Sequence, residues 1–151
     1  MFERPFFDRK NAVKLLLTVL LIAILLITFW GKDSKQVLLE FQESTMILSA
    51  PEEDAFRVSI AYEDISSMEL LAELDIGDCI SGTDLEDRKN GHWSNTAFGD
   101  YTLCIYADIP SYIRLDTSEG TVVFNYESSN TTQQLFDALA EHIEKKTAET
   151  E

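Results

Sequence analysis

The chain has 151 residues and a formal net charge of −15, because 27 acidic residues outnumber 12 basic ones. The acidity lies beyond residue 36, where 24 acidic and six basic side chains give a net charge of −18. Such a surface repels phosphate groups, so composition excludes nucleic acid as a partner. A cationic partner, a bound cation or a merely solubilising surface would each fit the charge.

An uncharged apolar run from Leu15 to Trp30 follows a polar and aromatic tail over residues 1–12. As a helix the run spans about 24 Å, and its flanking residues extend it toward the roughly 30 Å of a bilayer core. The pattern predicts one membrane helix over residues 13–31. No small-residue cleavage motif follows, which favours a signal-anchor over a cleaved signal peptide and a secreted domain. Four basic residues before the run and two after it predict a cytoplasmic N-terminus and an extracytoplasmic C-terminal domain at the cell membrane.

A linker over residues 32–36 leads into one domain over residues 37–146, where apolar and polar side chains alternate as in half-buried strands. A tight helical turn is expected at 62–65, and glycines predict a long loop over 75–91. The segment 67–74 fits a strand or a helix. The other predicted strands are 37–41, 45–48, 56–61, 92–98, 101–107, 112–116 and 121–126.

The apolar side chains of the later strands are expected to form one set, with Cys104 on the opposite face of its strand. The members of this set are Leu103, Ile105, Ile113, Leu115, Val122 and Phe124.

The last predicted element is an amphipathic helix laid against the sheet. Asn130 and Gln133 resemble a capping box at its start, and apolar residues then recur at helical spacing as far as Ile143. Residues 147–151 are expected to be a loose acidic tail.

Two stretches, VSIAYEDISSMELL at 58–71 and GDYTLCIYADIPSYIRLDTSEGTVVFNYES at 99–128, resemble bacterial pleckstrin-homology-like (PH-like) domains of membrane-anchored proteins. The resemblance implies a mainly β (α+β) fold, a barrel or sandwich of about seven strands capped by one C-terminal helix, and favours strand for 67–74. The family has no catalytic signature. It therefore implies a non-enzymatic protein-interaction module, whose partner is another membrane or envelope protein. Phosphoinositide binding is not expected, because the segments 42–45 and 51–54 are acidic where lipid-binding members carry a basic cluster.

No nucleophile–base order, phosphate-binding glycine loop or metal-ligand spacing is present, so no catalytic residue, cofactor or metal site is predicted. The acids Asp84, Glu86 and Asp87 miss the spacing of a calcium loop and are interpreted as a solvated run. A cation-binding accessory or sensor domain is the alternative function that the acidity leaves open.

Two residue pairs remain as candidates for a site or a cross-link. His92 and Trp93 are either a recognition surface at the mouth of the barrel or a strand in which Trp93 is buried in the core. Cys79 and Cys104 form either one disulfide or two free thiols.

Overall fold

The computed structural model describes residues 37–50 and 56–150, which belong to the second of two compact units, Lys35–Glu151. The elements of this part of the chain are β1 (Leu38–Phe41), β2 (Thr45–Ser49), β3 (Arg57–Ala61), the 3-10 helix η1 (Tyr62–Asp64), β4 (Ile65–Leu71), β5 (Asp78–Asp84), β6 (Arg88–Asn95), β7 (Gly99–Tyr106), β8 (Tyr112–Thr117), β9 (Gly120–Phe124) and α2 (Ser129–Thr150).

The membrane prediction is corrected by the helices that the structure describes. Across residues 37–50 and 56–150, none is long and apolar enough to cross a bilayer. The predicted span at 13–31, with its tail and linker, lies outside the described residues. The described residues therefore give no support to a signal-anchored, single-pass protein with an extracytoplasmic domain.

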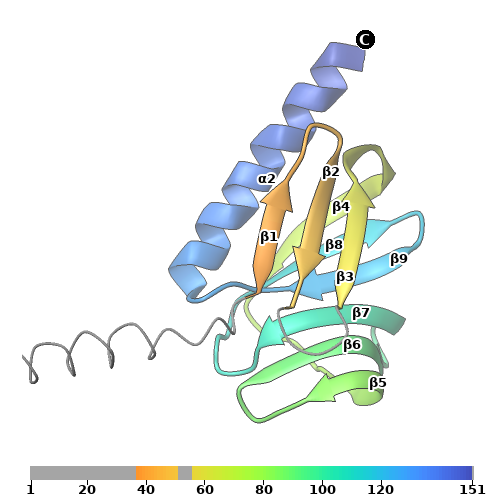
Figure 1. Cartoon of the computed structure of the whole chain (residues 1–151), viewed down its shortest axis with the longest axis vertical. Coiled ribbons are helices and arrows are strands. Elements are labelled where there is room, and N and C mark those ends of the chain that lie inside the picture. The colour runs from red at the N-terminus through yellow and green to blue at the C-terminus, as the bar shows by residue number, and fades with distance from the viewer. Residues whose placement is uncertain (1–36, 51–55, 151) are drawn as a thin grey trace, which may run out of the picture. The chain divides into compact units, whose positions relative to one another are not determined.

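The described strands form two sheets. The small sheet has the order β1-β2-β3, and the large sheet has the order β4-β8-β9-β7-β6-β5. Neighbouring strands are antiparallel except β7 and β9, which run parallel with Leu103 opposite Val123. Figure 1 shows the small sheet lying across the large one, with α2 running alongside β1. The predicted mainly β fold with one C-terminal helix is confirmed, but the predicted barrel or sandwich of about seven strands is wrong, because the described part of the chain builds nine strands in two sheets.

The region predicted as a long loop, 75–91, is mostly a hairpin. Strand β5 pairs with β6 from Asp78 opposite Ser94 to Asp84 opposite Lys89. Only a short turn separates the strands, and the N–H of Leu85 donates to the carbonyl oxygen of Arg88 at 2.9 Å across it. Strand β5 is the outer strand of the large sheet and is exposed on nearly every residue, so it lacks the apolar alternation that identifies a half-buried strand.

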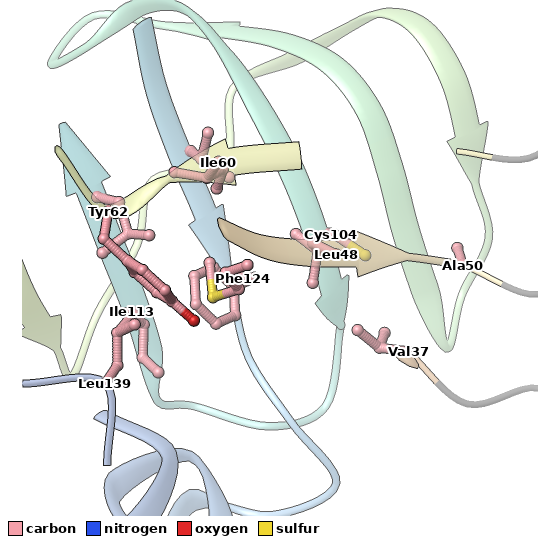
Figure 2. Close-up of a cluster of buried hydrophobic side chains, with 12 residues drawn as sticks. Val37, Leu48, Ala50, Ile60, Tyr62, Cys104, Ile113, Phe124 and Leu139 are labelled. Atoms are coloured by element: carbon pink, nitrogen blue, oxygen red, sulfur yellow. The ribbon is translucent and has the colours of Figure 1, made fainter. Parts of the chain in front are cut away.

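The first buried cluster lies between the two sheets and under α2. Phe124 is surrounded by side chains from both sheets and from the helix (Figure 2). The buried members of this first cluster are Val37, Met46, Leu48, Ala50, Ile60, Tyr62, Cys104, Ile113, Leu115, Val122, Phe124 and Leu139.

The second cluster occupies the opposite face of the large sheet. The connection from β4 to β5 crosses this face with Leu74 and Ile76, and the Tyr101 hydroxyl donates to the carbonyl oxygen of Ile76 at 2.7 Å. The buried members of this second cluster are Trp93, Tyr101, Leu103, Ile105, Tyr112 and Val123.

The predicted single apolar set is thus divided between the two faces. Leu103 and Ile105 belong to the second cluster, whereas the other four belong to the first. The parallel register causes this division, because it places Cys104, not Leu103, beside Phe124. The prediction that Cys104 lies on the other face from Leu103 and Ile105 is confirmed.

Asn125 extends the parallel pairing of β7 and β9 with its side chain. The residue is fully buried, its Oδ1 accepts from the N–H of Tyr106 at 2.7 Å, and its Nδ2 donates to the carbonyl oxygens of Tyr106 and Ile109 at 3.0 and 3.1 Å. The side-chain amide thus takes the place of a further backbone pair.

The cap of helix α2 lies at Ser128, two residues before the predicted cap Asn130. Ser128 Oγ accepts from the N–H of Thr131 at 3.1 Å, and Thr131 Oγ1 accepts from the N–H of Ser128 at 2.9 Å. This reciprocal pair is a capping box, in place of the one predicted at Asn130. The helix continues to Thr150, so the predicted tail is helical through that residue.

Candidate functional site

The space between the two sheets has two open sides, one along β1 and one along β3. Helix α2 covers the side along β1. The helix packs against η1, β4 and β8, and its His142 ring stacks on Phe41 of β1 with 5.1 Å between ring centroids. On the other side, along β3, lies a groove of about 570 Å³. This volume is within the usual range for ligand sites. We call it the β3 groove; its lining residues are Thr45, Arg57, Val58, Ser59, Ile60, Ala61, Asp64, His92, Asp100, Tyr101, Thr102, Thr117, Glu119, Gly120, Thr121 and Val122.

Two backbone hydrogen bonds establish which groups of β3 face its neighbour β2. The N–H of Tyr62 donates to the carbonyl oxygen of Ser44 at 3.1 Å. At the other end, the N–H of Ala50 donates to the carbonyl oxygen of Phe56 at 3.0 Å. Both are hydrogen-bonded pairs of one antiparallel register.

Hydrogen-bonded and non-hydrogen-bonded residue pairs alternate along an antiparallel ladder. The backbone N–H and C=O groups of Val58 and Ile60 therefore also form hydrogen bonds to β2. The intervening residues Arg57, Ser59 and Ala61 turn their N–H and C=O groups to the other side. No described strand pairs with β3 on that side. All three residues line the groove, so one of its walls is a free strand edge.

The floor of the groove is a row of side chains across the large sheet. Val122 of β9 is in register with Thr102 of β7, which is in register with His92 of β6. A second row begins with Thr117 of β8 opposite Gly120 of β9. With strands about 4.8 Å apart, the distance from β8 to β6 is about 14 Å, which is close to the length of five-residue β3.

The two ends of the groove differ in charge. At one end, β3 leads into η1, where Asp64 accepts a hydrogen bond from Ser118 Oγ at 2.9 Å. Ser118 belongs to the turn between β8 and β9, which also carries the exposed Glu119. Arg57 begins β3 at the other end, toward β6 and its His92. Among the described residues, the charged side chains at the first end, Asp64 and Glu119, are therefore both anionic.

The structure separates the predicted pair His92 and Trp93. Adjacent strand residues face opposite sides of a sheet, so His92 lies exposed in the β3 groove while Trp93, 2 % exposed, is in the second cluster. Lys89 Nζ lies 5.4 Å from the centroid of the Trp93 ring. Of the two residues, only His92 lines the groove.

The two cysteines are free thiols that the fold keeps apart. Cys79 is exposed on β5 and Cys104 is buried on β7, with β6 between them. Two strand spacings alone separate their Cα atoms by about 9.6 Å, beyond the ~7 Å limit of a disulfide. Burial raises the pKa of the Cys104 thiol to about 12, so it remains protonated at neutral pH.

The predicted acidic run lies in and around the β5–β6 turn, outside the β3 groove. Asp84 forms an ion pair with Lys89, and Asp87 lies 3.6 Å from Arg88 Nε. Among the described residues, no group of three or more His, Cys, Asp or Glu side chains is arranged to hold a metal ion.

The edge of the large sheet formed by β5 is less suited to pairing than β3. Its register with β6 shifts between Cys79 and Ser81, which places a bulge at Ile80. Bulges of this kind protect an edge against strand addition. By contrast, β3 keeps an uninterrupted register with β2 from Arg57 to Ala61.

No family model, curated protein or solved structure matches the chain. The resemblance to bacterial PH-like domains therefore remains a prediction, and function must be inferred from the groove.

Sequence reasoning named only one groove residue, His92, as a site candidate, because the lining comes from β2, β3, η1 and four strands of the large sheet. One signal was present in the sequence. Thr102 and Asp100 alternate with the apolar Tyr101 and Leu103, so one face of β7 is polar where it leaves the core.

Proposed function

We propose that this domain is a non-catalytic protein-binding module that adds an extended segment of another protein to β3 as a fourth strand of the small sheet. The observation that carries the proposal is the free edge of Arg57, Ser59 and Ala61, whose backbone groups face the β3 groove. Strand addition uses such an edge for affinity and the neighbouring surface for selection of side chains.

The charge of the domain selects a cationic segment. The net charge of −18 beyond residue 36 attracts basic chains and repels a second copy of the same domain. The groove itself contains the carboxylates Asp64, Asp100 and Glu119 against Arg57 and His92. Strand addition therefore favours a basic partner over self-association.

The length of the groove also suits one strand. An extended chain of five residues spans about 13 Å. The bound segment would lie between β3 and the floor formed by Val122, Thr102 and His92. Threonine hydroxyls and the imidazole can bond to polar side chains on the inner face of the segment.

Amide hydrogen exchange of the full-length protein tests this proposal. The probe is an end-blocked peptide of seven residues, alternating threonine and valine between an N-terminal lysine and a C-terminal glutamate. We expect exchange at Ser59 and Ala61 to slow by about tenfold or more at saturation, because their N–H groups gain partners. Exchange at Val58 and Ile60 should change little, because these N–H groups already bond to β2.

Two variants at one position provide the control. Ser59→Pro removes an N–H that faces the groove and keeps the β2 ladder, so it should abolish binding without unfolding the sheet. Ser59→Ala keeps the N–H and should bind as the parent does. Thr102→Arg, which fills the floor and leaves β3 intact, should also abolish binding. Protection without alternation between neighbouring residues, or no binding at all, would overturn strand addition.

A further inference from the structure

We infer that the bound segment runs antiparallel to β3 with its basic residue at its amino-terminal end. This inference rests on the proposed function, since it specifies the direction and charge order of the added strand. Three features of the β3 groove lead to it.

The first feature is the closed anionic end. The N–H of Ser118 donates to the carbonyl oxygen of Asp64 at 3.1 Å, and its Oγ donates to the carboxylate at 2.9 Å, so the β8–β9 turn is fixed beside η1. The backbone N–H of Glu119 donates to Thr117 Oγ1 at 3.2 Å, which holds this turn in shape. Asp64 and the exposed Glu119 therefore line the same end of the β3 groove, where both would attract an incoming ammonium or guanidinium group.

The second feature is the charge of the described side chains at the opposite end. Arg57 is exposed at the start of β3, and His92 lies across the floor from it on β6. Asp100 precedes Tyr101, which is opposite Thr121, so its backbone lies beside Gly120 of β9 and not at this end. A basic residue gains less there than beside Asp64 and Glu119, and an acidic residue can pair with Arg57.

The third feature is strand direction. Strand β3 runs from Arg57 toward Ala61, so an antiparallel segment enters with its amino-terminal end beside Asp64. Antiparallel pairs are more stable per residue than parallel ones and are two to three times as common. Strand β3 already pairs antiparallel with β2, and the same pleat continues into an added antiparallel strand.

A pair of peptides with exchanged charges tests the inference. The first is the lysine-to-glutamate peptide described above, and the second has glutamate at its first position and lysine at its last. With the full-length protein at low salt, we expect the first peptide to bind about threefold to tenfold more tightly, with a difference that falls as salt screens the rim charges.

A matched pair of variants locates the effect. Glu119→Gln should reduce the difference between the two peptides, because it removes a carboxylate from the anionic end. Glu127→Gln removes an equally exposed charge outside the groove and should leave the difference unchanged.

The outcomes separate this inference from the proposed function. Equal binding of the two peptides, or tighter binding of the second, overturns the inferred direction and charge order while strand addition stands. Failure of both peptides to bind overturns strand addition itself. A difference that persists unchanged in Glu119→Gln assigns the selectivity to another surface and overturns the inference as well.

Discussion

Gly82 and Gly91 face each other where β5 pairs with β6, and both have positive φ angles, 129° and 116°. A Cβ atom on Gly91 would lie 2.2 Å from the carbonyl oxygen of Ser81 and 2.7 Å from the Cα of Gly82. The two backbones therefore approach more closely than any side chain permits. His92, which lines the β3 groove, directly follows Gly91 in β6.

Gly91→Ala should lower the free energy of unfolding by about 3–5 kcal/mol, since it combines a forbidden φ with a backbone clash. Gly120→Ala is the matched control. Its φ of 131° is equally unsuited to alanine, but no atom lies within 4 Å of the added Cβ. We expect a loss of about 1–2 kcal/mol there, measured by urea unfolding at neutral pH. Equal losses would show that the close contact of the two strands contributes nothing.

At the scale of elements, the start of α2 depends on Ser128. Its side chain and that of Thr131 each accept a hydrogen bond from the other's backbone N–H. Helix α2 closes the β1 side of the sheets, so a frayed first turn loosens the cover over the first cluster.

Ser128→Ala should lower the free energy of unfolding by about 1 kcal/mol through the lost cap. Asn130→Ala, at the cap position that the sequence suggested, should change it by less than about 0.5 kcal/mol because Asn130 is an exposed residue within the helix. Thermal and urea unfolding of the two variants distinguish these results. A larger loss for Asn130→Ala would restore the predicted cap.

The elements that the sequence predicted correctly are those with a local signal. The turn at η1, the hairpin of β8 and β9 and the amphipathic α2 each follow from residues close together in the chain. Strand β5 was missed because both of its faces are largely exposed, so pairing with β6 defines it and no alternation marks it. The parallel pairing of β7 and β9 was missed because a strand pattern contains no information on which distant strand lies beside it.

The candidate site, too, was predictable only where a local sequence pattern defines it. Burial of Trp93 and exposure of His92 on one strand are consequences of a period of two. The β3 groove itself needs the crossing of two sheets, and residues from Thr45 to Val122 meet only in the folded chain.

At the scale of the whole molecule, the chain divides after Ser34 into two compact units. The second unit contains both sheets, α2 and both described clusters. It therefore has the core of an independent domain.

A chain that starts at Lys35 should fold and retain its β-rich circular dichroism. Its melting temperature should lie within about 3 °C of the same transition in the full chain, because no described core residue is removed. The Ser59→Pro and Ser59→Ala variants in the shortened chain should keep their difference in peptide binding. Loss of ordered structure on truncation would show that residues 1–34 complete the core.

The parallel neighbours β7 and β9 set the order in which the domain can assemble. Strands β5, β6 and β7 join through short turns, as do β8 and β9, so each group can form early from local contacts. The seam between β7 and β9 closes only after β8 has passed beyond β9, and the Asn125 amide then bonds across it. We expect this closure to limit the folding rate, with both groups, β5–β6–β7 and β8–β9, already formed in the transition state.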